Sequence, residues 1–379
     1  MAAPATLGQA FSGTPGLTLE LPLDGRVYRG REVLEAIDRL FAAHHLSRAA
    51  ALGLRWLVDF VEANGGRLDL TGQRFALLGA SAELSPAPLL LAAGATVRWL
   101  DVKPPPPETR GAFIATRDGD DLLARPHEAI AALRAFAEEG PVHVGLFAYA
   151  PGKSRELLLA GVMDALVRTL GPGVVKSVAT YISPTSPGEM QAEDLAAAEH
   201  LRASPTWWQR AAALSGALQG PGSYGGVART VISLQGAAYQ AAQYVTKRIA
   251  AEVLAADGLG GQSVTLSTNV AGITNTRSLS HPLFQIAFQG APSFGVRIFE
   301  PALTRAVSGY LMLHDLLNPQ APAAAGQQSE APLARAKAAH VEQIHGAAYD
   351  LPWQFESAVK TAAVVGLTKR PQVLLRRGR

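Results

Sequence analysis

The fold of this chain is decided by one stretch, Arg74-Phe75-Ala76-Leu77-Leu78-Gly79-Ala80-Ser81-Ala82-Glu83-Leu84-Ser85-Pro86. Its first part is an apolar run that predicts a buried strand. Small residues then form a turn, and Pro86 suits the first turn of a helix, which residues 89–95 continue. Residues 96–101 predict a second strand that ends on an acid, Asp101. Together these segments predict a strand–helix–strand unit with parallel strands.

This order of elements is that of a dinucleotide-binding unit. Its turn needs small residues, because backbone N–H groups must approach a pyrophosphate closely. Gly79 and residues 80–82 meet that need, and Asp101 lies 22 residues past Gly79, near the spacing of the acid that binds the adenosine ribose. Such an acid favours NAD over NADP, although Lys103 softens the preference. A tight turn without a ligand would have the same sequence. Glu83 fits least, because its carboxylate repels a pyrophosphate unless it points away or binds the ribose.

Composition predicts a globular protein. The chain has 379 residues, 48% hydrophobic and 17% charged, which suits one large domain with additions or two domains. The formal net charge is only +3, and part of it comes from residues 376–379. No basic stripe is interleaved with aromatic residues, so we do not expect nucleic-acid binding. The chain has no cysteine, which excludes disulfides and thiolate chemistry.

The sequence shows no targeting or membrane signal. Its start lacks the basic and apolar regions of a signal peptide. No apolar run reaches the roughly 18–20 residues that span a bilayer. We therefore expect a cytoplasmic protein without a membrane span.

Strands and helices are expected to alternate after the opening unit. Strands are expected at residues 142–149, 174–183, 227–233 and 263–270, and helices at 122–139, 156–170 and 237–256. This alternation predicts an α/β fold, a doubly wound parallel sheet of Rossmann type covered by helices on both faces.

The remaining segments are additions to that sheet. Residues 1–72 are expected to form an N-terminal helical extension, with a long helical pattern from about residue 30 to 64 that has His44 and His45 between its halves. Residues 73–318 form the Rossmann-like domain, with an insertion at about 188–228. Residues 319–379 are expected to be a linker and a C-terminal tail.

A second candidate site is the helix that follows Ser233. Tyr239, Gln243 and, less exactly in phase, Lys247 share one face of this helix, and Tyr244 lies beside Lys247. A phenol, with its pKa near 10, needs a nearby cation to exchange protons near neutral pH, and lysine supplies one. An amphipathic helix with an exposed lysine and core tyrosines explains the same pattern equally well.

A third candidate follows the last expected strand. Asn269, Thr274 and Thr276 flank a glycine turn there, and their polar groups could contact a cofactor amide. An ordinary exit from a strand into a loop explains them as well.

Taken in order, these motifs resemble the short-chain dehydrogenase/reductase family. The sequence has a Gly-Ala-Ser turn, an acid after the second strand, a serine before a tyrosine–lysine helix, and a Gly-x-x-x-Thr exit similar to the family's Pro-Gly-x-x-x-Thr. The similarity covers roughly residues 73–315. It implies a Rossmann sheet, NAD or NADP as cofactor, and carbonyl–alcohol redox chemistry on a small-molecule substrate. We also expect a homo-oligomer.

The resemblance also implies site residues by position. Gly79, Ser81 and Leu84 would line the pyrophosphate, Asp101 the ribose, and Thr274 and Thr276 the nicotinamide. The full candidate sets are Gly79, Ala80, Ser81, Glu83, Leu84, Asp101, Asn269, Thr274 and Thr276 for the cofactor, and Tyr239, Tyr244, Lys247, Ser233 and Gln243 for catalysis, with Tyr239 as the acid.

The sequence departs from the family in both sets. Glu83 and Ser85 replace the second and third glycines. Gln243 stands where the family has its lysine; glutamine can hydrogen-bond a ribose but cannot lower a phenol pKa by charge. Lys247 lies one turn later. Ser233 is closer to the tyrosine than is usual, and Ser183, at the end of the preceding strand, is an alternative.

These departures leave three hypotheses open. The first is an oxidoreductase, the second a degenerate Rossmann scaffold that mediates assembly or regulation, and the third a redox-neutral enzyme such as a lyase or cyclase. Trp207, Trp208 and Tyr224 in the insertion suit the wall of a large or apolar substrate pocket, and core packing explains them equally well.

Other chemistries have weaker support. Ser280-His281 and His314-Asp315 have the residue types of a hydrolase triad, but no Gly-x-Ser-x-Gly elbow frames a nucleophile. We expect the histidines to be structural and no metal site, because adjacent His44 and His45 point in different directions on a helix.

Overall fold

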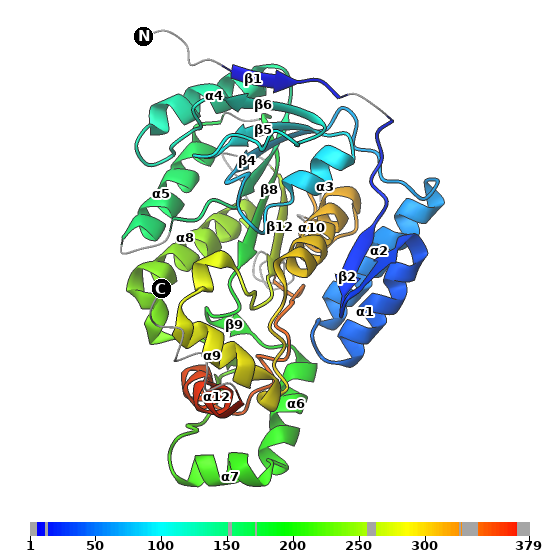
Figure 1. Ribbon diagram of the computed structural model, residues 1–379. Coiled ribbons are helices and arrows are strands. Elements are labelled where there is room, and N and C mark those ends of the chain that lie inside the picture. Colours follow the sequence, from blue (N-terminus) through cyan, green and yellow to red (C-terminus); the bar gives the residue numbers. More distant parts are fainter. Residues whose placement is uncertain are drawn as a thin grey trace.

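The computed structural model describes residues 6–11, 14–150, 154–170, 173–255, 263–325, 327 and 340–369. Within them, one central sheet has the strand order β1-β6-β5-β4-β7-β8-β12 (Figure 1). Its strands are β1 Thr6–Gln9, β4 Arg74–Leu78, β5 Thr96–Leu100, β6 Ala112–Thr116, β7 Val142–Leu146, β8 Val175–Ile182 and β12 Thr265–Val270. All pair in parallel except β1, which is antiparallel to β6.

The parallel strands have the order of a dinucleotide-binding fold. Numbered along the chain from β4, they lie in the order 3-2-1-4-5-6. From β4 the strand order therefore extends to one side through β5 and β6, and to the other side through β7, β8 and β12. The boundary between β4 and β7 is the topological switch point, where such folds bind their ligands. The predicted α/β, doubly wound sheet of Rossmann type is confirmed.

Helices cover both faces of the sheet, as Figure 1 shows. Alternate residues of β4 supply the two cores: Phe75 and Leu77 face one, and Ala76 and Leu78 face the other. The first core holds α1 Val33–Ala42, α2 Arg48–Ala63, α3 Ala87–Ala92 and α10 Pro301–Leu317, and the second holds α4 Pro126–Glu138, α5 Arg155–Arg168 and α8 Gly236–Leu254. The predicted helices at 122–139, 156–170 and 237–256 are thus present.

The N-terminal region contributes to the sheet as well as to the helical layer. Strand β1 forms one edge, and the hairpin of β2 Glu20–Leu23 and β3 Arg26–Arg29 packs with α1 and α2. The long helical pattern is interrupted at His44, whose φ of 58° is incompatible with a continuous helix. Ser47 then caps α2 by accepting the Ala50 N–H at 3.2 Å.

The insertion and the C-terminal segments form a third core. It has residues from α6 Ala192–Ala203, α7 Trp207–Leu214, β11 Val227–Ala228, α9 Pro282–Gly290, the 3-10 helix η4 Ala291–Phe294 and α12 Phe355–Lys369. The insertion also contains β9 Gly188–Glu189 and β10 Ser223–Tyr224. The strand expected at 227–233 was wrong in length and place. Only β11 forms, in a small sheet with β10 and β9, because the 3-10 helix η2 Ser233–Gln235 begins soon after it.

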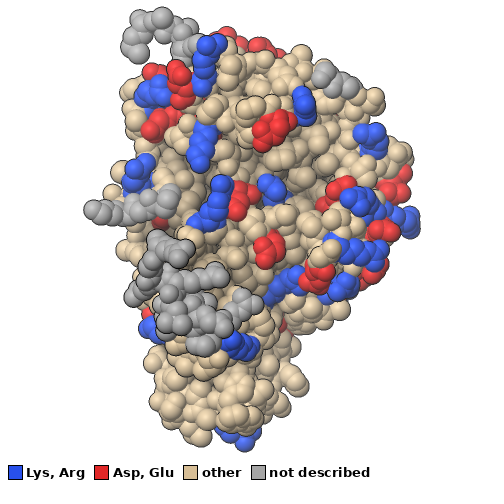
Figure 2. Space-filling view, viewed as in Figure 1, with Lys and Arg blue, Asp and Glu red and all other residues tan. Residues whose placement is uncertain are grey.

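The insertion aromatics do not all line a pocket or a core. Trp207 and Tyr224 are 82% and 81% exposed, and Leu214 is 85% exposed. Trp208 alone of the three aromatics packs inward, edge-on against Phe294 with ring centroids 5.2 Å apart. On the face seen in Figure 2, lysines and arginines lie among acids, and the lower end carries few charges.

None of the helices in the described part of the chain combines the length and apolar character needed to cross a bilayer. Much of the expected linker and tail, at residues 326, 328–339 and 370–379, lies outside the described residues.

Gly79 sets the spacing at the switch point. Its φ is +89°, and a Cβ added there would overlap the backbone nitrogen of Ala148, just after β7. Gly65, at the end of α2, has nearly the same φ of +87° but open space around its Cβ position. Substitution at Gly65 therefore adds backbone strain alone, whereas substitution at Gly79 adds backbone strain and steric overlap.

We expect Gly79→Ala to lower the free energy of unfolding by more than about 3 kcal/mol, because it adds overlap to strain. The matched Gly65→Ala variant should lose about 1–2 kcal/mol, the cost of a left-handed backbone alone. Urea unfolding measures both. Equal losses in the two variants would contradict the close backbone approach at the switch point.

Candidate functional site

The candidate residues gather at the carboxyl edge of the sheet. Because the strands are parallel, the Gly79 turn after β4, Asp101 after β5, Ser183 after β8 and the loop after β12 all leave at that edge. Hydrogen bonds join them in two groups, one around the turn and one around Tyr239.

Asp101 braces the turn. Its Oδ2 accepts the Ser81 N–H at 2.9 Å, and its Oδ1 accepts the Lys103 N–H at 3.1 Å. Only 8% of Asp101 is exposed. The acid thus lies against the turn, where a ribose-binding acid belongs, with acceptor capacity left on each oxygen. Ala80 is buried in the same turn, and Ser81 and Leu84 are half-buried.

Glu83 points away from the turn backbone. One of its oxygens accepts the Arg277 backbone N–H at 3.0 Å and lies 3.4 Å from Arg277 Nε. Arg277 begins the 3-10 helix η3 Arg277–Leu279, in the loop after β12. The Arg277 guanidinium therefore neutralises the Glu83 carboxylate. The ion pair links the turn after β4 to the loop after β12.

Tyr239 is joined to Ser183. Its hydroxyl donates to Ser183 Oγ at 2.6 Å, and Ser183 Oγ lies 2.8 Å from Thr185 Oγ1. Gln243, one turn along α8, accepts the Ser183 backbone N–H through Oε1 at 2.9 Å. Of the two serines that the sequence offers, Ser183 is therefore the one in contact with Tyr239, and Gln243 fixes its backbone.

Three other candidates lie elsewhere. Ser233 Oγ donates to Glu356 at 2.5 Å, so it does not join the Tyr239 group. Tyr244 is 61% exposed. Lys247 Nζ donates to the Pro187 carbonyl at 2.5 Å and lies 5.9 Å from the Tyr244 ring. The lysine is partly buried but hydrogen-bonds the backbone rather than the phenol.

Burial sets the pKa values of this group. It raises the pKa of Tyr239, and the polar neighbours Ser183 and Thr185 offset this rise only in part. It lowers the pKa of Lys247 to about 8. At neutral pH Tyr239 is therefore protonated, and its proton is held more tightly than that of a free tyrosine.

Two of the three candidates at the end of β12 face inward. Asn269 is fully buried, and its Nδ2 donates to the Ser308 carbonyl at 3.3 Å. Thr274 Oγ1 lies 2.7 Å from Thr304 Oγ1. Thr276 Oγ1 is half-buried and lies 2.8 Å from Ser278 Oγ. Asn269 and Thr274 therefore hydrogen-bond α10 and fix it against the end of β12. Of the three candidates, only Thr276 is partly exposed to solvent.

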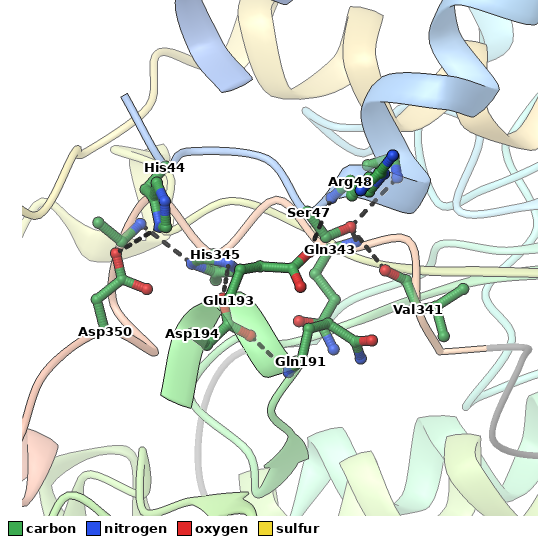
Figure 3. A network of polar contacts seen from close by, with 12 residues as sticks. His44, Ser47, Arg48, Gln191, Glu193, Asp194, Val341, Gln343, His345 and Asp350 are labelled. Atoms are coloured by element: carbon green, nitrogen blue, oxygen red, sulfur yellow. Dashed lines mark hydrogen bonds and ion pairs between the residues drawn. The ribbon is translucent and has the colours of Figure 1, made fainter. Parts of the chain in front are cut away.

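A second polar network lies below the edge (Figure 3). His345 Nε2 lies 3.0 Å from Asp194 Oδ1, and His345 Nδ1 accepts the Ala347 N–H at 3.1 Å. His44 Nδ1 lies 3.3 Å from Asp350. These contacts join the α1–α2 loop, the insertion and the C-terminal segment.

Ser47 closes this network. Its Oγ donates to the Val341 carbonyl at 2.6 Å and accepts the Gln343 N–H at 3.0 Å. Gln343 in turn donates to the Glu189 carbonyl at 2.8 Å. The network therefore fixes segments far apart in the sequence.

His314, Asp315 and Glu342 form a buried ionisable cluster. His314 Nδ1 lies 3.0 Å from Glu342 Oε1 and 3.3 Å from Asp315 Oδ1. Burial alone would lower the pKa of His314, but its two carboxylate partners outweigh burial and raise the pKa to about 9. Burial and the charge of Asp315 raise the pKa of Glu342 to about 8.

These two clusters are the groups of the described residues that could hold a metal ion: Asp194, His345 and Asp350, and His314, Asp315 and Glu342. The sequence indicated only the adjacent pair His314-Asp315, because the other members come from separate segments. Neither includes a residue of the Tyr239 group.

A scan against protein-family models finds no match for this chain, and a search of curated proteins finds no relative of it. Function is therefore inferred from the geometry of the site.

The His314 cluster predicts a pH dependence of stability. The unfolded chain releases these protons near pH 4.5 (Glu342) and 6.5 (His314), whereas the native state keeps them to about pH 8 and 9. The native state therefore binds more protons, and stability should fall between pH 6.5 and 8, by at most about 1.4 kcal/mol per pH unit for each proton. Below that range, half-buried His45, His143 and His340, whose pKa values are lowered to about 4, act in the opposite sense.

Urea unfolding between pH 6.5 and 8 measures this dependence. Glu342→Gln should flatten it, and Glu32→Gln, at an exposed carboxylate, should leave it unchanged. A native state whose stability is constant over this range, or a Glu342→Gln variant with the wild-type slope, would disagree with the cluster's protonation.

Proposed function

We propose that this protein is an NAD(P)-dependent oxidoreductase, similar to short-chain dehydrogenases, that reduces a carbonyl or oxidises an alcohol. The observation that carries the proposal is the 2.6 Å hydrogen bond from Tyr239 to Ser183 at the carboxyl edge of a 3-2-1-4-5-6 sheet. A tyrosine and a serine at that edge can both hydrogen-bond a carbonyl oxygen.

The residues around the turn fit a dinucleotide. Gly79 and the small residues 80–82 would allow close approach of the pyrophosphate, and Asp101 beside them would accept the ribose hydroxyls. A carboxylate there disfavours the additional phosphate of NADP. Since Glu83 is turned toward Arg277, it no longer opposes binding at the turn. We therefore favour NAD.

The cofactor would carry the hydride, and side chains of the protein would supply the proton and orient the substrate. The nicotinamide, when bound, supplies or accepts the hydride. Tyr239 donates a proton to the carbonyl oxygen, and Ser183 orients the phenol and the substrate oxygen. The raised pKa of Tyr239 keeps its proton in place at neutral pH, so the reaction would begin from the neutral phenol.

One observation favours a second candidate. Lys247 hydrogen-bonds the Pro187 carbonyl, and Gln243 holds the Ser183 backbone, so neither charge nor a ribose ligand is directed at Tyr239. A Rossmann scaffold with a redox-neutral or non-catalytic role would have the same arrangement.

The cytoplasmic location and the homo-oligomer stay predictions from the sequence.

Two tyrosines of α8 provide a matched test. With NADH and a panel of aldehydes and ketones, Tyr239→Phe should lower kcat by about 100-fold or more, because the proton donor is lost. Tyr244→Phe, on the same helix but exposed, should keep the wild-type rate. NADH absorbance follows the reaction. Equal activity in wild type and Tyr239→Phe, or no turnover by wild type with any carbonyl, would favour the scaffold.

A further inference from the structure

An apolar cavity adjoins the Tyr239 group. Its interior measures about 60 Å³, which is several times the space that one water needs and suits a slender ligand. Its walls come from α9, η4 and α12 and from the loops after β8 and β12. Phe284, Phe288, Phe294 and Phe355 contribute aromatic surface, and small alanines leave the space between them.

The cavity is polar at one end only. Of its 17 lining residues, Thr185 and Gln235 alone carry polar side chains. Thr185 Oγ1 lies 2.8 Å from Ser183 Oγ, which accepts the hydrogen bond that the Tyr239 hydroxyl donates. The polar end therefore coincides with the proposed proton donor, and the remaining wall offers only dispersion contacts and exclusion of water.

The wall is fixed rather than loosely packed. A Cβ on Gly290 of α9 would overlap the Ala362 carbonyl, and a Cβ on Gly366 of α12 would overlap the Ile286 carbonyl. Glycine thus lets the two helices pack backbone to backbone. Ala287 on α9 and Ala358 on α12 line the cavity and are only 6% and 3% exposed. The cavity persists between tightly joined helices because its lining residues are small.

We propose that this cavity holds the aliphatic chain of the substrate, so that the protein acts on a fatty carbonyl compound whose oxygen meets Tyr239 and Ser183. The inference rests on the proposed function for the reaction, but the binding of the chain can be measured without it. A flexible apolar chain matches a wall without polar groups, and its one polar head matches the single polar end.

The test is a series of straight-chain primary alcohols, from butanol to dodecanol, titrated into the full-length protein without nucleotide. Each buried methylene should tighten binding about fourfold until the cavity is filled, after which the affinity should level off. Isothermal calorimetry gives the dissociation constants. A cyclic alcohol of similar carbon number should bind more weakly than the straight chain.

Variants locate the binding. Ala358→Leu and Ala287→Leu fill the cavity from opposite helices, so each should weaken decanol binding at least tenfold and make the affinity level off at a shorter chain. Ala363→Leu, on α12 but outside the cavity lining, should bind as wild type does. Two lining variants are used so that one that fails to fold does not decide the result.

The outcomes separate this inference from the proposed function. Affinity that does not depend on chain length, a preference for the cyclic alcohol, or unchanged binding in both lining variants overturns the aliphatic site. Chain-dependent binding that both lining variants weaken supports it, even if the protein turns over no carbonyl with NADH, in which case the proposed reaction alone fails.

Discussion

The close approach of the Gly79 turn to the backbone after β7 is the constraint on which the rest of the structure depends. It lies at the one point where the order of the sheet reverses. Strands β4 and β7 pair there, and the Phe147 N–H donates to the Leu78 carbonyl at 2.7 Å. Any side chain at position 79 would push the backbones of β4 and β7 apart. The two halves of the sheet, whose carboxyl ends form the candidate site, would then separate as well.

Around this point, side chains from distant segments fix each loop of the edge. Asp101 holds the turn, Glu83 and Arg277 connect it to the exit of β12, and Tyr239 holds the end of β8. The Ser47–Gln343 contacts tie the N-terminal and C-terminal regions together beneath them (Figure 3). The edge is therefore preorganised by short polar contacts on one side and by the glycine-mediated α9–α12 pair on the other.

The sheet could be predicted because its signals are local. The apolar run at residues 74–78, the small turn and the acid at 101 lie within one strand–helix–strand unit, and the later alternation repeats it. The break at His44 could not be predicted, because it depends on a left-handed backbone that tertiary contacts hold. The strand expected at 227–233 failed because β-branched residues alone do not supply a partner strand.

The sequence indicated which residue types the site contains, but not which residues contact one another. Tyr239 stood out in sequence, but the choice between Ser183 and Ser233 depends on how α8 packs against β8. The partner of Glu83 lies 194 residues away, so no local pattern reveals Arg277. The cavity was hidden for the same reason: α9 and α12, which form its wall, are separated by α10 and by the linker region.

We propose that the turn after β4 and the loop after β8 form one nucleotide site. Hydrogen-exchange mass spectrometry with and without saturating NADH tests it most directly. Exchange should slow in residues 79–85, where the backbone N–H groups would meet the pyrophosphate, and in residues 181–186 beside Tyr239. Unchanged exchange in both segments, with NADH and with NADPH, would contradict it.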